Sequence, residues 1–171
     1  MTLDRQPTLE GPTLRVRPLR PEDLEPLYAV ARDPLIWEQH PAHDRWRREV
    51  FERLFAESLA SGGALVVLTR DGETIGSSRY DGLDAERSRV EIGWTFLARS
   101  HWGGPANREL KRLMLDHAFG CVDVVVFRVG AGNRRSRRAV EKLGAVEVAT
   151  EPDARLGEHI VYELRRDDWR G

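Results

Sequence analysis

Two segments in the second half of the sequence share one arrangement, in which an apolar strand leads through a turn of small residues into a helix. The first is "FLARSHWGGPANRELKRLMLDHAF", residues 96–119, and the second is "VVVFRVGAGNRRSRRAVEKLGA", residues 124–145. Each helix connects one strand to the next, and crossovers of this length join parallel strands. The two segments therefore predict a sheet that is locally parallel at its centre.

The remaining patterns surround this centre with antiparallel strands. "TLRVRPL", residues 13–19, alternates apolar and basic residues, as a half-buried strand does. "ALVVLTRDGETIGSSRY", residues 64–80, predicts two strands joined by a type I′ turn at Asp71 and Gly72, and residues 89–98 predict a third. Helices are expected at 20–32, within 45–63, at 106–119 and at 134–143, and further strands at 124–129, 145–149 and 159–165.

We therefore expect one α+β domain, residues 1–171, with about seven strands in a mixed, mostly antiparallel sheet and about four flanking helices. Residues 1–10 are expected to be flexible, since chain ends are often poorly ordered. The length supports one hydrophobic core but not two.

The composition argues against several kinds of protein. With 27 basic and 28 acidic residues the net charge is −1, so we expect no direct binding to nucleic acid. No segment has the roughly 18 apolar residues of a membrane span, the start has no apolar leader, and Cys121 is the only cysteine. We therefore expect a soluble, cytoplasmic protein that does not bind membranes and has no disulfide. The histidines lack cysteine or acidic partners at ligand spacing, so no metal site is predicted.

The turn before the first crossover helix has the features of an anion site. The first N–H groups of a helix have no partner and lie at the positive end of its dipole. Gly103, Gly104 and Ala106 have little side chain to keep a phosphate from these groups. A tight corner between strand and helix is the alternative explanation of these small residues.

The second crossover helix begins in a cluster of arginines, at positions 134, 135, 137 and 138. Like charges at a positive helix end repel one another, so this cluster favours an anion as its partner; a solvated helix face is the alternative. Asn133 is at the expected N-cap and Ser136 on the inward face. Two such turns on one sheet edge suit a long polyphosphate ligand such as coenzyme A.

The same residues resemble a known family. "EIGWTFLARSHWGGPANRELK" is similar to "W-G-x-G-A-N-x-E-x-K" and "NRRSRRAVEKLGA" to "N-x-x-S-x-x-A-x-x-K-L-G", both typical of the RimJ/RimL-like branch of the GNAT acyltransferase superfamily. The resemblance implies the GNAT fold, whose sheet is splayed at its middle. It also implies an acetyl-CoA-dependent N-acetyltransferase, in which a primary amine (a protein N-terminus, a small amine or an amino-acid derivative) attacks directly in a ternary complex. Homodimers are common among relatives.

The resemblance assigns cofactor contacts to three groups of residues. The pyrophosphate would lie on the turn, with Lys111 one helical turn further on reaching a phosphate. The pantetheine arm would pair with the end of the preceding strand and approach the start of the second helix. Pro105 replaces a usual glycine and removes one N–H donor, which predicts weaker binding of coenzyme A. The implied cofactor residues are Phe96, Leu97, Ala98, Trp102, Gly103, Gly104, Ala106, Asn107, Lys111, Asn133, Arg135 and Ser136.

Two residues are candidates for proton transfer. The alternation of "VEIGWTFL" puts Val90, Ile92, Trp94 and Phe96 on one face and Glu91 on the other, beside small neighbours. Relatives use a glutamate of this strand as the base. Many also use a tyrosine of the second helix as the acid, but Val140 stands there, which leaves Ser136. A solvated carboxylate and a serine that satisfies its own helix end are the alternatives.

Acceptor contacts are expected from the loop "PLIWEQHPAHDRW", residues 34–46, because relatives often line the acceptor cleft there. A non-catalytic acyl-CoA-binding module is the alternative function, and its predicted signature is cofactor binding without turnover. The antiparallel first half and the lack of a G-x-G-x-x-G after the first strand argue against a third alternative, a Rossmann-type nucleotide-binding domain. The candidate acceptor residues are Trp37, His40, Trp46, Arg79 and Tyr162, while Tyr162 and His159 are also weaker candidates for the acid.

Overall fold

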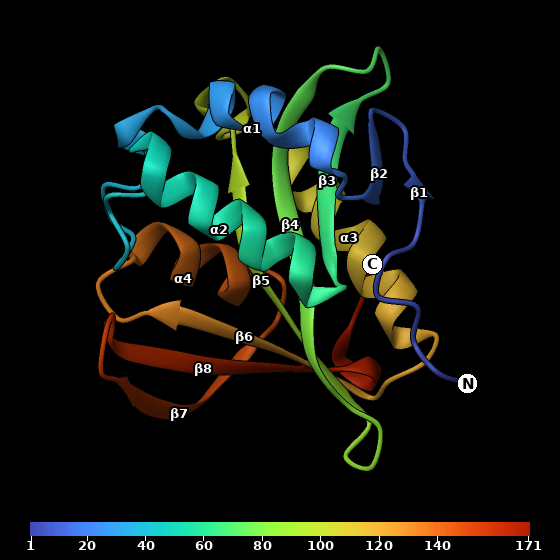
Figure 1. Ribbon diagram of the computed structural model, residues 1–171. Helices are drawn as coiled ribbons and strands as arrows, with labels where there is room; N and C mark the ends of the chain where they lie inside the picture. Colours follow the sequence, from blue (N-terminus) through green and yellow to red (C-terminus); the bar gives the residue numbers. More distant parts are fainter.

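All neighbouring strands of the sheet are antiparallel except one central pair. The computed structural model describes residues 1–171 as an eight-stranded sheet of order β1-β2-β3-β4-β5-β6-β8-β7, flanked by four α-helices (Figure 1). The elements are β1 Leu9–Glu10, β2 Leu14–Pro18, α1 Leu24–Ala31, α2 Arg48–Ser61, β3 Ala64–Thr69, β4 Thr74–Asp84, β5 Arg89–Leu97, α3 Ala106–Phe119, β6 Val124–Gly130, α4 Arg134–Lys142, β7 Val146–Asp153 and β8 Gly157–Arg165.

The parallel pair is β5 and β6, as the crossover helices predict. Their register covers only residues 89–91 of β5 against 124–126 of β6. Beyond Glu91 the two strands separate, and Figure 1 shows them running in different directions. The expected mixed sheet, splayed at its middle, is confirmed, with one short strand more than predicted.

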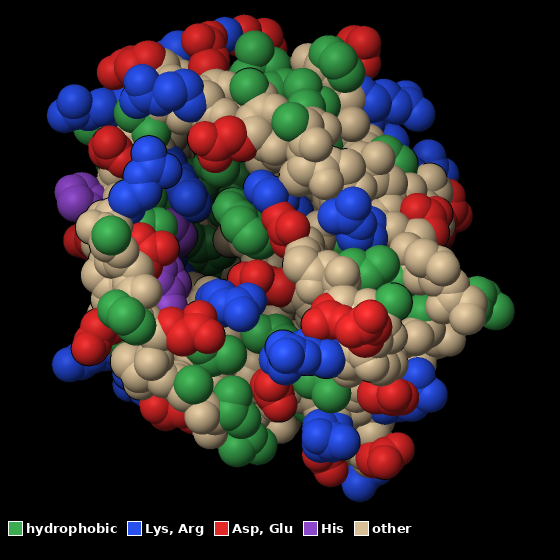
Figure 2. Space-filling model, turned by 60° about the horizontal axis from the view of Figure 1, so that its bottom comes forward, with side chains coloured by type: hydrophobic (Ala, Val, Ile, Leu, Met, Phe, Trp, Pro, Cys, Tyr) green, Lys and Arg blue, Asp and Glu red, His purple; other side chains and the backbone are tan.

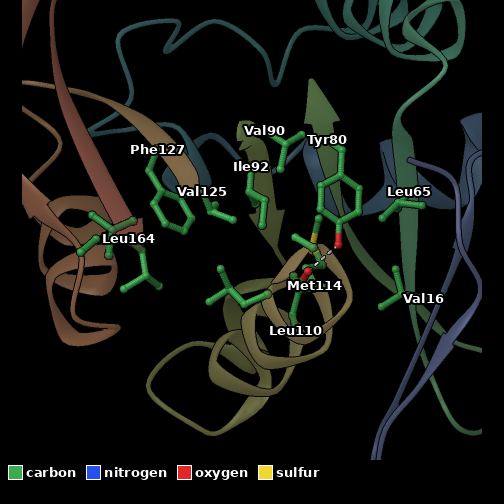
Figure 3. Close-up of a cluster of buried hydrophobic side chains, with 14 of the residues drawn as sticks. Val16, Leu65, Tyr80, Val90, Ile92, Leu110, Met114, Val125, Phe127 and Leu164 are labelled. Atoms are coloured by element: carbon green, nitrogen blue, oxygen red, sulfur yellow. Dashed lines mark hydrogen bonds between the residues drawn. The ribbon is translucent and has the colours of Figure 1, made fainter. Parts of the chain in front are cut away.

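Helices cover both faces of β3 and β4. Along β3, Val66 and Leu68 pack with residues of α1 and α2, whereas Leu65 and Val67 pack with residues of α3. Figure 3 shows the α3 side, where Tyr80 points at the helix. Its hydroxyl donates to the carbonyl oxygen of Met114 at 2.6 Å, and the side chain is fully buried. A buried phenol needs such a partner, so this bond helps to fix α3 on the sheet.

An extra residue in β5 changes which side chains share a face. Arg79 of β4 pairs with Gly93, but Ser77 pairs with Phe96, so three steps on β5 match two on β4. Trp94 takes up the difference with a φ of 52°, as in a β-bulge. Phe96 therefore packs with α1 and α2, opposite to Ile92. The predicted shared face of Val90, Ile92, Trp94 and Phe96 is wrong beyond Ile92, because the bulge shifts the alternation by one residue.

Two further details differ from simple sequence patterns. The turn after β3 has a positive φ only at Gly72, so it is not type I′, which needs positive φ at both central residues. The first ten residues, expected to be flexible, lie against the rest of the chain. Leu3 is 5% exposed within the main core, and the Asp4 carbonyl oxygen lies 2.7 Å from His117 Nε2. None of the helices combines the length and apolar character needed to cross a membrane.

Candidate active site

The separation of β5 and β6 opens a cleft of about 1010 Å³. Figure 2 shows a hollow in the surface, with histidine, basic and acidic side chains around its rim. The walls come from the segment between α1 and α2, the second half of β5, the starts of α3 and α4, and the end of β6. Of the predicted site residues, the cleft is lined by Trp37, His40, Phe96, Leu97, Trp102, Gly103, Gly104, Asn107, Lys111, Asn133, Arg135, Ser136 and His159.

The start of α3 is open to an anion. Pro105 is the N-cap of this 14-residue helix, and its side chain accepts no hydrogen bond. The first N–H groups of the helix are therefore not capped by a side chain. Gly103, with a φ of 72°, and Gly104 have no atom within 4 Å of the place where a Cβ would stand. The turn therefore leaves room above the helix end that a phosphate can fill. Ala98 and the buried Ala106 do not line the cleft.

The start of α4 also lines the cleft. Contacts with the segment between α1 and α2 and with the turn before α3 hold it in place. Asn133 Oδ1 accepts from Ser136 N at 3.3 Å, which caps the helix. Arg135 donates to the carbonyl oxygen of Ile36 at 3.1 Å, and its guanidinium lies 3.8 Å from the centre of the Trp102 ring. This stack ties the starts of α3 and α4 to the segment between α1 and α2. Arg137 instead bonds to the Tyr162 hydroxyl, outside the cleft.

The cleft is strongly basic. None of its lining residues is aspartate or glutamate. A long polyphosphate has the charge to match it, and the residues present therefore fit coenzyme A. Eight lining residues have basic side chains: Arg45, Arg108, Lys111, Arg128, Arg134, Arg135, Arg138 and Lys142.

Glu91 lies beside the cleft but does not line it. Its carboxylate pairs with Arg128 at 2.7 Å, and Arg128 also bonds to Glu151 at 3.1 Å. Burial raises the pKa of Glu91, and the charge of Arg128 opposes this effect. The candidate base is thus paired with an arginine that lines the cleft. Arg128 points outward from β6, and the sequence offered no signal that it would reach this site.

Lys111 does not lie among the phosphate donors of the turn. Its side chain is buried at 5% exposure, and Nζ donates to Thr95 Oγ1 at 2.6 Å, directly after the bulge. Thr95 Oγ1 lies 2.8 Å from Ser78 Oγ. Burial without a carboxylate partner lowers the pKa of Lys111 to about 7. The place of this lysine in the apolar stripe that contains Met114 and Leu115 is a signal that could have predicted its burial.

The expected acceptor residues divide into two groups. Trp37 and His40 line the cleft, and Trp37 packs against Phe96 with ring centres 5.1 Å apart. Arg79, Tyr162 and Trp46 do not line it. Arg79 lies over the Trp94 ring at 4.0 Å and pairs with Asp81. Tyr162 is buried at 1% exposure and bonds to Arg137 and Glu141. Trp46 is on the surface.

Comparisons with known proteins agree with this geometry. Residues 13–146 match the family described as acetyltransferase (GNAT) domain. No curated protein sequence matches the chain.

Solved structures share the fold. A GCN5-related N-acetyltransferase from Brucella melitensis is 19% identical with a TM-score of 0.81, covering 96% of this chain and 80% of its own. Mycobacterium smegmatis RimJ in complex with CoA-disulfide is 18% identical with a TM-score of 0.76, covering 98% and 91%. Spermidine N-acetyltransferase from Vibrio cholerae, in complex with CoA and spermine, is 17% identical with a TM-score of 0.72, covering 92% and 98%. With its fold, its basic cleft and the match over residues 13–146, the chain belongs to the GNAT family of acetyltransferases and is an acyltransferase that uses acetyl-CoA.

Proposed function

We propose that the protein transfers the acetyl group to a primary amine, either a protein N-terminus or a small amine or amino-acid derivative, and that it belongs to the RimJ/RimL-like branch. The observation that carries this proposal is the basic cleft between β5 and β6, which opens at the uncapped start of α3. The folds of RimJ and of spermidine N-acetyltransferase support both kinds of acceptor without choosing between them.

The chain's own residues can hold the cofactor in two ways. The free N–H groups at the start of α3, with Arg108, Arg134 and Arg138, offer donors to the phosphates. The edge of β5 beyond Glu91 has no strand partner on the β6 side, so its backbone can pair with the amides of the pantetheine arm. Acetyl-CoA supplies an acetyl group held as a thioester.

Proton transfer is assigned to Glu91 and Ser136. The acceptor amine must lose a proton to attack, and Glu91 takes it through a water molecule, since its carboxylate pairs with Arg128 and does not line the cleft. The raised pKa of Glu91 favours this role because a stronger base accepts a proton more readily. Ser136, which lines the cleft at the first turn of α4, donates a proton to the leaving thiolate.

The test is the release of free thiol from acetyl-CoA across a panel of ribosomal-protein N-terminal peptides, amino acids and polyamines. We expect turnover on one class of amine. Glu91→Gln should reduce turnover by about 10²-fold or more while leaving the affinity for acetyl-CoA unchanged in calorimetry.

The matched control is Glu163→Gln, because Glu163 also pairs with an arginine, Arg89, at 2.6 Å but does not line the cleft. It should retain activity. Tight binding of acetyl-CoA without turnover on any amine would instead support a non-catalytic binding module. Full activity of Glu91→Gln would remove this residue from the mechanism.

A further inference from the structure

Arg45 and His40 lie next to each other in the segment between α1 and α2, and both line the cleft. Arg45 NH1 is 3.4 Å from His40 Nε2. The His40 ring is itself fixed, because its Nδ1 accepts from the backbone N–H of Ala42 at 2.9 Å and the ring packs at 87° against that of Trp37. These contacts hold His40 in a defined position beside Arg45 in the cleft wall.

The two facing nitrogens are both donors. Burial, followed by the charge of Arg45, lowers the pKa of His40 to about 3, so the ring is neutral at physiological pH. In a neutral imidazole one nitrogen accepts and the other carries the proton. Since Nδ1 accepts from Ala42, the proton is on Nε2, and this N–H faces the guanidinium of Arg45. Two donors cannot bond to each other, but they can share one acceptor.

Arg45 also has no counter-ion in the chain. It forms no ion pair, whereas Arg128 across the cleft has two carboxylate partners. Burial lowers the pKa of Arg45 to about 10, although Glu57 and Asp44 oppose this effect. Arg45 is half-buried, and a cation that loses part of its water without gaining a carboxylate is costly for the fold. An anion that enters the cleft would relieve this cost and would also satisfy the His40 N–H.

We propose that the acceptor amine carries its own anionic group, a carboxylate or a phosphate, and that Arg45 and His40 bind this group. The inference rests on the proposed function and specifies its substrate class. It also disfavours polyamines, because a cationic acceptor would find no aspartate or glutamate in the lining and would face Arg45. Free amino acids, acidic N-terminal peptides and phosphorylated amines fit the site.

The experiment compares pairs of amines that differ in the anion. Lysine is set against cadaverine, glycine against glycinamide, and phosphoethanolamine against ethanolamine, with thiol release as the readout. We expect kcat/KM to be at least about tenfold higher for the anionic member of the pairs that react, as a charge-assisted hydrogen bond provides. The first two pairs test a carboxylate, and the third tests a phosphate.

Variants of Arg45 connect the preference to this residue. Arg45→Met should remove most of the preference for anionic amines by raising the KM for the acceptor, while the KM for acetyl-CoA stays unchanged. Arg45→Lys should keep part of this preference. Arg53→Met changes an exposed arginine of α2 outside the cleft and should behave like the wild type.

Three results would overturn the inference. Equal or better turnover of the uncharged and cationic amines would reject an anionic acceptor while leaving acetyl transfer intact. A rise in the KM for acetyl-CoA alone in Arg45→Met would assign this site to the phosphates of the cofactor. Absence of turnover on every amine, with acetyl-CoA bound in calorimetry, would reject the proposed function and the acceptor inference together.

Discussion

Replacing Lys111 by methionine should make the protein more stable. Lys111 is buried at 5% exposure with only Thr95 Oγ1 as its partner, and burial lowers its pKa from the ordinary value of 10.5 to about 7. One pKa unit corresponds to about 1.36 kcal/mol, so the protonated lysine costs the folded state on the order of 5 kcal/mol. Methionine has a similar length and no charge. It loses one hydrogen bond of about 1 kcal/mol, while Thr95 and Ser78 keep each other as partners.

The effect depends on pH, and its sign follows from the lowered pKa. Below pH 7 lysine is protonated in both states, and the folded state bears the full cost. Between about 7 and 10.5 the unfolded chain binds more protons than the folded one, so the stability of the wild type rises with pH. Above 10.5 the cost is absent. The advantage of Lys111→Met should therefore be largest near and below pH 7 and should shrink as the pH approaches 10.

The assay is urea unfolding at pH 6.5, 8.0 and 9.5, supported by thermal melts. At pH 6.5 we expect a gain of about 2–4 kcal/mol after allowance for relaxation around the site, which for this size corresponds to roughly 5–15 °C in Tm. Lys142→Met is the control, because Lys142 is the only other lysine and is exposed. A variant that is less stable than the wild type at every pH, or an advantage that does not change with pH, would refute the reasoning.

Two further predictions concern the start of α3 and its attachment to the sheet. Pro105→Gly restores a backbone N–H at the helix start. Calorimetry should show that acetyl-CoA binds severalfold more tightly, because a charge-assisted hydrogen bond contributes more than the entropy cost of glycine. Unchanged or weaker binding would contradict the role given to this turn. Tyr80→Phe removes the bond from the buried hydroxyl to the Met114 carbonyl oxygen, which keeps the N–H of Ala118 as its helical donor, and should lower the free energy of unfolding by about 0.5–1.5 kcal/mol in urea titrations. A change within error would mean that this bond does not help to hold α3 on the sheet.

The sequence predicts the central part of the fold well, because its signals are local. The apolar runs, the small-residue turns and the helix starts around Gly103 and Asn133 each lie within one segment, and together they locate the end of the cleft that we propose for the cofactor. The bulge at Trp94 is different. Nothing in "VEIGWTFL" marks the extra residue, since its positive φ is imposed by pairing with β4 and not by a glycine.

The end of the cleft that we propose for the acceptor depends on contacts between distant segments, which the sequence does not predict. Arg45 reaches the cleft because the segment between α1 and α2 is held at the start of α4, where Gln39 accepts from the backbone N–H of Arg135 at 3.2 Å. Arg128 was overlooked for the same reason, because its partner Glu91 comes from another strand. Neither pairing has a signature in the linear sequence.

The bulge in β5 also bears on how relatives of this chain can diverge. The extra residue reverses the alternation of side chains, so each residue after Trp94 points to the opposite face from the one that a regular strand would give it. Loss of a single residue there would exchange Phe96 and Leu97 between the two cores that they now fill. Selection should therefore tolerate substitutions along this strand but not changes of its length. New acceptor specificities are then expected to arise in the segment between α1 and α2, where insertions leave the sheet unchanged.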